Sequence, residues 1–318
     1  MTSLVRPLSL ASQRSLLHLS SNGSRRSMGL WPKIRPVRIK VITMDVTGTI
    51  VSFRGTLEEH YVGAAEKSGI PSSQLQHKRF GASFNQAYKE CCEMHPCFGG
   101  NIMSAKEWWR ICVQRSFQLA GVEMDPHQQD VVFQRIYSTF GSHAAYESFQ
   151  DAKPFLQWAR RSGLVTGILS NADERYGDSI LPMLGITLDE VQFHCFSKDY
   201  QIEKPHSQFF QAAIRAAVPW LLANQPTKFQ KEQQLLLQPK GSSVVNLDAI
   251  CAPSEVLHIG NDYEKDFEGA RRAGMHCVLL DRYAEDEKAA EWKRRGAPVL
   301  KDLLDVVEFL GRSNCRLG

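Results

Sequence analysis

The chain has 318 residues, of which 43% are hydrophobic and 23% charged, a composition typical of a soluble globular protein. This length is enough for a large core and for more than one domain. No apolar run comes near the ~20 residues that a membrane-spanning helix needs, so we expect no membrane partner. Residues 45–318 carry 30 basic and 34 acidic residues, which gives no indication of nucleic-acid binding.

The basic charge is concentrated at the N-terminus. Residues 1–44 contain eight Lys or Arg, eight Ser and no Asp or Glu. Arg-rich, Ser-rich and acid-free segments are typical of mitochondrial transit peptides, and the compact apolar stretch of a secretory signal is missing. We therefore expect residues 1–34 to be a transit peptide and the protein to be mitochondrial. The alternative is a disordered tail on a cytoplasmic protein.

The chain has eight cysteines and no CxxC pair, which favours a reducing compartment. The segment CCEMHPC brings Cys91, Cys92, His95 and Cys97 close together in sequence. Its spacing matches no familiar zinc pattern, and no second ligand pair follows. We expect these residues to belong to the core and loops of a helical region.

The first strand signal is the apolar run at residues 37–44, which ends at Asp45. Near-continuous apolar character with Val and Ile predicts a strand buried on both faces, as in a parallel sheet. An acidic residue at the carboxyl end of such a strand lies where open α/β sheets bind ligands. Gly48 then allows the backbone to turn. Alone, the stretch is equally compatible with a strand followed by an ordinary polar turn.

Residues 55–148 show helical signals and no convincing strand. Ser104 and Glu107 form a capping box, and Asp125 followed by Pro126 begins a later helix. Apolar residues recur at helical spacing in three further sets: Leu57, Tyr61 and Ala64; Phe80, Phe84 and Tyr88; Trp109, Val113 and Phe117. We expect a helical module in which Trp109 and Phe117 belong to its own core rather than to a substrate pocket.

From residue 149 onward, strands and helices alternate. Helices are predicted at 151–161, 174–184, 207–218 and 263–273, strands at 164–169, 191–196, 256–259 and 277–280, and closing helices at 285–311. This order predicts a Rossmann-like, doubly wound parallel sheet. Residues 35–54 and 149–318 would form this core, with residues 55–148 as an inserted helical module. Residues 219–254 are rich in Gln and other polar residues, so we expect a surface insertion there, with a short helix around 228–237.

Four short motifs occur in order after predicted strands or at helix starts. They are DVTGT at 45–49, Ser170-Asn171, Lys204-Pro205 and GNDYEKD at 260–266. In this order they resemble the motifs of the haloacid dehalogenase-like hydrolase superfamily, over residues 37–311. The resemblance implies a Rossmann-like core that carries an α-helical cap.

The resemblance also implies catalytic and phosphate-binding roles. Asp45 takes the position of a nucleophile that forms a covalent aspartyl intermediate. Lys204 would keep Asp45 ionised and balance the charge of the transferring group. Ser170 and Asn171 would donate hydrogen bonds to phosphoryl oxygens, together with Lys204. Each motif also has an ordinary structural interpretation: Ser170-Asn171 as a helix cap, and Lys204 as a surface lysine.

A Mg²⁺ ion is the implied cofactor. Its candidate ligands are Asp45, the DVTGT backbone at Thr47, and the acidic motif with Asn261, Asp262 and Asp266. Because Asn261 stands where the family often has an Asp, a neutral amide replaces a charged ligand. We therefore expect Mg²⁺ to bind weakly.

Thr47 is the second departure from the family pattern. Family phosphatases have a second Asp there, which protonates the leaving alkoxide, and a threonine hydroxyl is a poor acid near neutral pH. Two interpretations follow. One is a hydrolase acting on a small anionic, phosphorylated metabolite. The other is a catalytically impaired pseudo-hydrolase that binds a ligand or a protein. The sequence identifies neither the substrate nor a protein partner.

Overall fold

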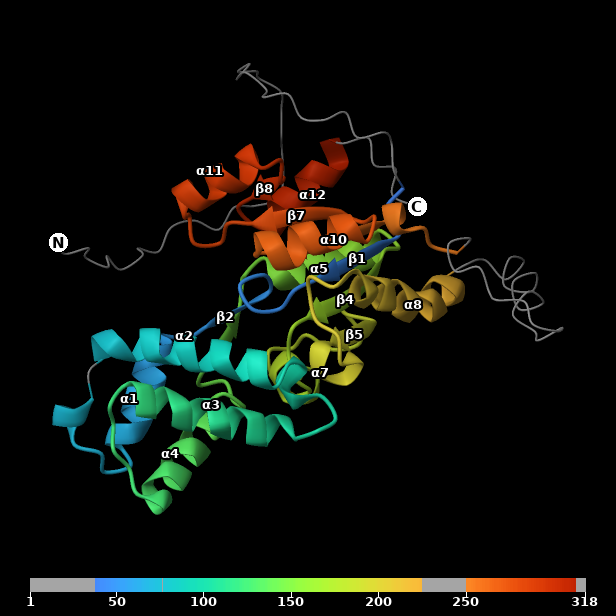
Figure 1. The fold of residues 1–318 in the computed structure, drawn as a ribbon. Coiled ribbons are helices and arrows are strands. Elements are labelled where there is room, and N and C mark those ends of the chain that lie inside the picture. Colours follow the sequence, from blue (N-terminus) through green and yellow to red (C-terminus); the bar gives the residue numbers. More distant parts are fainter. Residues whose placement is uncertain (1–37, 76, 225–249, 313–318) are drawn as a thin grey trace, which may run out of the picture. The chain divides into compact units, whose positions relative to one another are not determined.

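The structure is a computed structural model that describes residues 38–75, 77–224 and 250–312, and its core is one parallel sheet (Figure 1). The six strands lie in the order β5-β4-β1-β6-β7-β8, and every neighbouring pair is parallel. Their bounds are β1 Val41–Met44, β4 Val165–Ser170, β5 Phe193–Phe196, β6 Val256–Gly260, β7 His276–Leu280 and β8 Val299–Leu300. The predicted doubly wound α/β core is confirmed.

Strand β1 lies inside the sheet, where its sequence requires it to be. Val41 pairs with Val165 of β4 on one side and with Val256 of β6 on the other, and all four residues of β1 are buried. The chain then builds outward from β1 in both directions. The carboxyl end of β1 is therefore the switch point at which open α/β sheets bind ligands.

Helices cover both faces of this sheet. Ile42 and Met44 point to the face covered by α5 Ala152–Arg161 and α12 Leu303–Arg312. Val41 points to the opposite face, which packs against α8 Ser207–Ala223, α10 Gly269–Arg272 and α11 Asp286–Arg294. The alternation follows from the two-residue period of a strand, and it explains why the core strands are apolar almost throughout.

Two segments predicted as α-helices begin instead as π-helical turns. Residues 174–184 form η3 Tyr176–Ile180, followed by α6 Leu181–Met183. Residues 263–273 form η6 Tyr263–Glu268, followed by α10. Sequence periodicity cannot separate i→i+4 from i→i+5 bonding over a single turn. Both π-helical turns come shortly after a predicted motif, and such turns are frequent at functional sites.

The cap consists of four helices that the chain inserts between two short antiparallel strands. The helices are α1 Leu57–Glu66, α2 His77–Met94, α3 Ala105–Leu119 and α4 Pro126–Thr139, and the strands are β2 Val51–Phe53 and β3 Tyr146–Ser148. The capping box of Ser104 and Glu107 is confirmed. The prediction of no strand within residues 55–148 is wrong at β3, because three residues are too few to show an alternating pattern.

Shorter elements complete the described part of the chain. They are the 3₁₀ turns η1 Ser72–Gln74, η2 Cys97–Gly99 and η5 Pro253–Glu255, and the helix α7 Ser197–Tyr200. Helix α8 continues past the predicted end at residue 218 and contains Pro219. The helix predicted around 228–237 and the N-terminal segment 1–34 lie outside the described residues.

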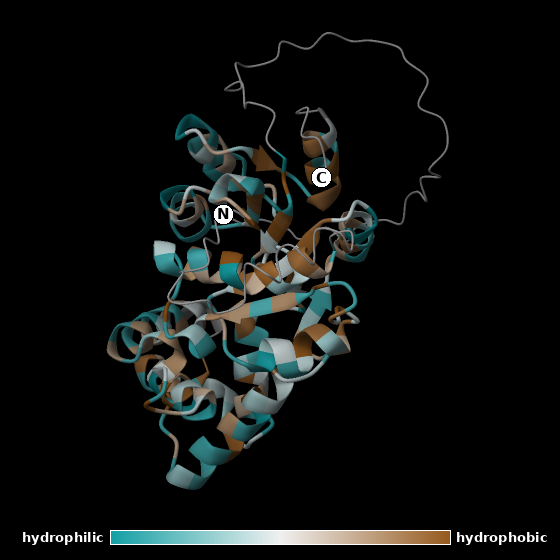
Figure 2. Cartoon of the chain, turned by 90° about the vertical axis from the view of Figure 1, so that its right-hand side faces the viewer, coloured by the Kyte–Doolittle hydropathy of each residue, from teal (hydrophilic) through white to brown (hydrophobic). Residues whose placement is uncertain are grey.

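Three sequence expectations can be compared with this fold. The cap helices carry both brown and teal residues in Figure 2, as amphipathic helices do. None of the described helices is long and apolar enough to cross a membrane. Cys91 and Cys97 are buried, as expected for residues of a helical core. No group of three or more His, Cys, Asp or Glu within the described ranges is arranged to hold a metal.

Candidate active site

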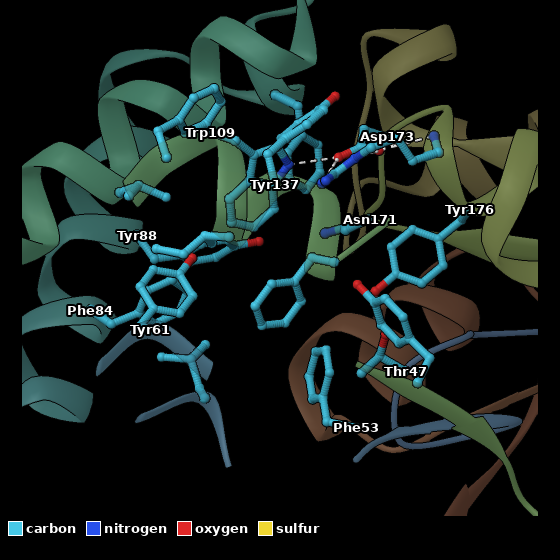
Figure 3. Close-up of a pocket in the computed structure, with 18 of the residues that line it drawn as sticks. Thr47, Phe53, Tyr61, Phe84, Tyr88, Trp109, Tyr137, Asn171, Asp173 and Tyr176 are labelled. Atoms are coloured by element: carbon cyan, nitrogen blue, oxygen red, sulfur yellow. Dashed lines mark hydrogen bonds and ion pairs between the residues drawn. The ribbon is translucent and has the colours of Figure 1, made fainter. Parts of the chain in front are cut away.

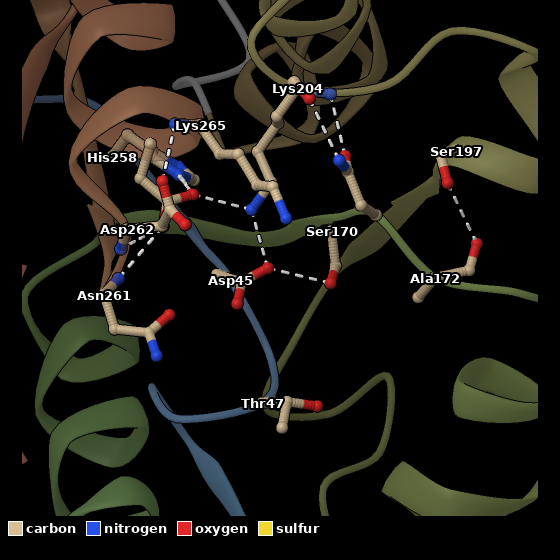
Figure 4. Close-up of polar contacts among 12 residues, drawn as sticks. Asp45, Thr47, Ser170, Ala172, Ser197, Lys204, His258, Asn261, Asp262 and Lys265 are labelled. Atoms are coloured by element: carbon tan, nitrogen blue, oxygen red, sulfur yellow. Dashed lines mark hydrogen bonds and ion pairs between the residues drawn. The ribbon is translucent and has the colours of Figure 1, made fainter. Parts of the chain in front are cut away.

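The predicted motifs come together at the carboxyl ends of β1, β4 and β6 (Figure 4). The backbone N–H of Asp45 donates to the carbonyl of Ile259 at 2.9 Å. This bond extends the pairing of β1 with β6 by one residue, so Asp45 is held beside the residues that follow β6. Ser170 is the last residue of β4, on the other side of β1.

Asp45 accepts two hydrogen bonds on a single carboxylate oxygen. Lys204 Nζ donates to Asp45 Oδ1 at 2.6 Å, and Ser170 Oγ donates to the same oxygen at 2.8 Å. The Lys204 side chain is only 2% exposed, against 13% for that of Asp45. The lysine is therefore buried, and the carboxylate remains open to a ligand.

Lys204 is placed by Asn171 through its backbone. Asn171 Nδ2 donates to the Lys204 carbonyl at 3.0 Å, and the Lys204 N–H donates to Asn171 Oδ1 at 2.7 Å. These two bonds tie the loop after β4 to the loop before α8. Asn171 thus positions Lys204, and the phosphate contact predicted for Asn171 stays a prediction.

Asp266 is the second carboxylate on Lys204, and it is the most enclosed acid of the site. Its Oδ1 accepts from Lys204 Nζ at 2.6 Å and from His258 Nε2 at 3.0 Å. Its Oδ2 accepts from the backbone N–H groups of Asn261 at 3.0 Å and Asp262 at 2.9 Å. Both oxygens are therefore occupied by donors, and the Asp266 side chain is 1% exposed.

Electrostatic interactions keep the buried pair of Lys204 and Asp266 ionised. Burial by itself would lower the pKa of Lys204, but the carboxylates of Asp266 and Asp45 raise it above its ordinary value. Burial would likewise raise the pKa of Asp266, but the nearby Lys204 ammonium and the His258 hydrogen bond hold it well below its ordinary value. Lys204 is thus a permanent cation at neutral pH.

His258 completes the network as a neutral imidazole. Burial lowers its pKa even though it contacts Asp266. Since a carboxylate can only accept, Nε2 carries the proton, and Nδ1 accepts from the Thr43 hydroxyl at 2.9 Å. No motif in the sequence pointed to His258. The available signal was a histidine inside an otherwise apolar parallel strand, which needs buried partners.

Asn261 and Asp262 occupy different environments from Asp266. Asp262 is the N-cap of η6, and its Oδ1 accepts from the backbone N–H of Lys265 at 2.8 Å. Asn261 lies against the DVTGT loop, because a Cβ added to Gly48 would meet Asn261 Nδ2 at 2.1 Å. Gly48 also has φ of +80°, which favours glycine. The glycine therefore allows the two loops to approach closely at Asp45.

Thr47 faces away from this network. Its hydroxyl is hydrogen-bonded to the Tyr176 hydroxyl at 2.8 Å. Burial raises the pKa of Tyr176 above its ordinary value, although its bond to Thr47 opposes this. Neither hydroxyl is therefore a strong acid near neutral pH. Tyr176 was not identified from the sequence, because it lies in a segment that was assigned only as a helix.

A cavity of about 340 Å³ extends from Thr47 into the cap (Figure 3). More than half of its lining residues carry an aromatic ring: Phe53, Tyr61, Phe84, Tyr88, Phe98, Trp109, Phe133, Tyr137, Phe140, Tyr146 and Tyr176. Phe117 is buried in the cap core, as predicted. The prediction is wrong for Trp109, which is only partly buried and lines the cavity, whereas its neighbour Trp108 is buried.

Comparison with known proteins accounts for the order of the motifs. The family model for haloacid dehalogenase-like hydrolases matches residues 39–274, nearly three quarters of the chain. The chain belongs to the haloacid dehalogenase-like hydrolase family. It is 26% identical to haloacid dehalogenase-like hydrolase domain-containing protein 3 of Bos taurus, over 88% of this chain and 98% of the relative. It is 25% identical to the Homo sapiens protein of that name, over 77% and 82%.

Solved structures of the family share the fold at low identity. A HAD phosphatase from Thermococcus onnurineus superposes with a TM-score of 0.50 at 17% identity, over 86% of this chain and 98% of the neighbour. A 2-haloacid dehalogenase from Pseudomonas syringae gives 0.51 at 19%, over 86% and 99%. The magnesium-bound HAD-hydrolase YfnB of Bacillus subtilis gives 0.51 at 12%, over 86% and 99%. These neighbours are described as a phosphatase, a dehalogenase and a hydrolase, and the chain shares their fold.

Proposed function

We propose that the chain is a hydrolase in which Asp45 attacks the phosphorus of a small phosphorylated metabolite. The observation that carries this proposal is the arrangement of Lys204 and Ser170 on one oxygen of Asp45, at 2.6 and 2.8 Å. A carboxylate becomes a useful nucleophile when the negative oxygens of its target are neutralised. The buried Lys204 ammonium provides a fixed positive charge for that purpose.

The reaction would proceed in two displacements. An oxygen of Asp45 forms a bond to phosphorus while the bond from phosphorus to the leaving oxygen breaks, and that oxygen departs with the electron pair. Water then attacks the aspartyl phosphate, which releases inorganic phosphate and restores Asp45. Ser170 Oγ–H and Lys204 Nζ–H are the donors already present at the point where phosphoryl oxygens would lie.

The residues present fit a weakly held Mg²⁺. Asp45 Oδ1 is occupied by Lys204 and Ser170, so Oδ2 and the Thr47 backbone carbonyl are the candidate ligands from the DVTGT loop. Asn261 lies against that loop at Gly48, whereas both oxygens of Asp266 are already hydrogen-bonded. When bound, Mg²⁺ would neutralise charge on the phosphoryl group.

Calorimetric titration with Mg²⁺ tests this fit without an activity assay. We expect weak binding to the wild type and tighter binding to Asn261→Asp, which restores a charged ligand. Submicromolar affinity of the wild type, or equal affinity of the two proteins, would contradict the assignment.

Thr47 limits which esters such a site would hydrolyse. General acid assistance is worth about 10²–10⁴ in rate, and the Thr47 and Tyr176 hydroxyls are poor acids near neutral pH. Alkyl phosphates release strongly basic alkoxides, so they would be slow substrates. The leaving groups of aryl and acyl phosphates are weaker bases that need no proton to depart, so these esters are the better candidate substrates.

A pseudo-hydrolase that binds a phosphorylated ligand or a protein is the second candidate. Three features favour it: Thr47 in place of an acid, Asn261 in place of a charged metal ligand, and Asp266 with both oxygens occupied. Asp45 and Lys204 would then bind the ligand without turning it over.

A substrate screen with the full-length chain separates the two candidates. Phosphate esters, phosphonates and haloacids should be tested with and without Mg²⁺, for the wild type and for Asp45→Asn. We expect turnover of an activated phosphate ester by the wild type and none by the nearly isosteric Asp45→Asn. Phosphate binding without turnover on any substrate class would favour the pseudo-hydrolase.

A further inference from the structure

We propose that the substrate is an aryl phosphate whose aromatic leaving group fills the cavity between cap and core. This inference rests on the proposed function, and it adds the chemical class of the leaving group. Three features of the cavity support it: its aromatic walls, their charge, and the residues at the end where Thr47 lies (Figure 3).

The walls are aromatic surfaces supplied mainly by the cap. Phe84 and Tyr88 come from α2, Trp109 from α3, and Phe133 and Tyr137 from α4. Aromatic rings pair favourably with other rings in offset or edge-on arrangements, beyond the gain from burial itself. An apolar cavity of about 150 Å³ is large enough for benzene, so a volume of about 340 Å³ accommodates a ring with substituents.

The described walls of the cavity offer no unpaired charged side chain to a second anionic group. Among the described residues that line it, the charged ones are Asp173 and Arg175, which bind each other through Arg175 Nη2 to Asp173 Oδ2 at 2.8 Å and Nε to Oδ1 at 2.9 Å. Trp109 Nε1 donates to the same carboxylate at 2.7 Å. The Arg175 guanidinium lies 4.6 Å from the centre of the Tyr137 ring. These paired charges favour an uncharged group in the cavity.

These contacts also join cap to core around the cavity. Trp109 and Tyr137 belong to the cap, whereas Asp173 and Arg175 follow β4 of the core. Lys198 of α7 makes a second link between core and cap, since its Nζ donates to the carbonyls of Phe98 at 3.0 Å and Met103 at 2.6 Å. Phe98 itself lines the cavity. The aromatic walls are thus held in place before a ligand arrives, which favours a rigid, flat group.

At the end of the cavity where Thr47 lies, two residues after Asp45, the leaving oxygen would meet no strong acid. Thr47 and Asn171 line this end, and Asn171 directly follows Ser170, which binds Asp45. When the bond from Asp45 to phosphorus forms, the bond from phosphorus to the aryl oxygen breaks and an aryloxide leaves with the electron pair. A phenol has a pKa of about 10, as in tyrosine, so the aryloxide departs unprotonated and takes its proton from water. The missing acid and the aromatic cavity therefore point to the same leaving group.

Binding of phosphonates that cannot be hydrolysed tests the inference separately from catalysis. Benzylphosphonate has a methylene in place of the ester oxygen of phenyl phosphate, and ethylphosphonate is its counterpart without a ring. We expect the full-length protein to bind benzylphosphonate at least about 10-fold tighter, the effect of burying roughly two methylene equivalents. The affinity for cyclohexylmethylphosphonate should lie between these two affinities, because its ring is apolar but not flat.

Two matched variants on α2 connect the preference to the cavity. Phe84 lines the cavity, whereas Phe80, one turn earlier, is buried in the cap core and does not line it. Phe84→Leu should reduce the preference for benzylphosphonate over ethylphosphonate by about 3- to 10-fold. Phe80→Leu should leave the preference unchanged, even if it lowers the melting temperature.

The outcomes separate the inference from the proposed function. Equal affinity for benzylphosphonate and either comparison phosphonate overturns the inference, and so does equal loss of preference in both variants. If the ring preference holds and follows Phe84 while phenyl phosphate is never hydrolysed, the cavity remains an aromatic ligand site. In that case it is the proposed function that fails.

Discussion

The acidic motif contains two aspartates four residues apart, Asp262 and Asp266, and the structure predicts opposite outcomes for the same substitution. Asp266 receives four hydrogen bonds, two on each oxygen, from Lys204, His258 and two backbone N–H groups. In Asp266→Asn one oxygen becomes an NH₂ group. Whichever way the amide turns, that donor faces two other donors.

The side chain at position 266 has no room to move away from these donors. A Cβ added to Gly260 would lie 2.2 Å from Asp266 Cγ, so backbone and carboxylate are already in close contact. Removing one partner of a buried ion pair typically costs about 3–5 kcal/mol. Lys204 keeps Asp45 as a partner, so we expect the loss of unfolding free energy in Asp266→Asn to be near the lower end of this range. Against a total free energy of unfolding of about 5–15 kcal/mol, this is a large loss.

Asp262→Asn is the matched control. Asp262 caps η6 by accepting from the backbone N–H of Lys265, and asparagine is as good an N-cap as aspartate. We expect its effect to stay within about 0.5 kcal/mol, as for most substitutions outside buried networks. Urea unfolding of wild type and both variants at pH 7, followed by circular dichroism, measures the difference. A loss below about 1 kcal/mol in Asp266→Asn, or equal losses in both variants, would refute the reasoning.

Three further predictions concern the acid position, pH and the N-terminus. Thr47→Asp should raise the turnover of benzyl phosphate by up to about 10²–10⁴-fold and that of phenyl phosphate much less. Thr47→Asn is the control, because it introduces no acid. Equal gains on both esters would mean that residue 47 is not at the acid position. Burial lowers the pKa of His258, so the unfolded chain takes up a proton first and stability should decrease as pH falls below about 6.5. In His258→Gln that slope should flatten by at most about 1.4 kcal/mol per pH unit in urea unfolding at pH 7.5, 6.5 and 5.5, and an unchanged slope would exclude His258 as its source. We propose that residues 1–34 direct the chain to mitochondria, and a diffuse cytosolic signal from a fluorescent reporter fused to them would contradict this.

Much of the fold could be predicted because the deciding chemistry is local. The apolar run before Asp45 predicts a strand buried on both faces, and β1 is buried throughout, with a neighbouring strand on each side in the core sheet. The capping box of Ser104 and Glu107 starts α3 where predicted, since a cap is satisfied within four residues of chain. The four motifs could be placed after predicted strands or at helix starts for the same reason.

The structure was needed wherever a choice depends on partners far away in sequence. Asp262 and Asp266 are equivalent in sequence, and only the approach of Lys204, 62 residues from Asp266, distinguishes the buried carboxylate from the helix cap. Trp108 and Trp109 are adjacent, yet Trp108 is buried in the cap and Trp109 reaches Asp173, 64 residues away.

The sequence by itself predicted the class of fold and the positions of the four motifs, because periodicity, caps and motif order are properties of neighbouring residues. Only the tertiary structure decided how those residues share hydrogen bonds and that the cap presents an aromatic cavity at Thr47. The physical reason is that a hydrogen bond or a cavity wall is a property of groups in space. Its members come from β1, β4, β6 and the cap helices, and the free energy that holds them depends on burial, which no single segment can determine.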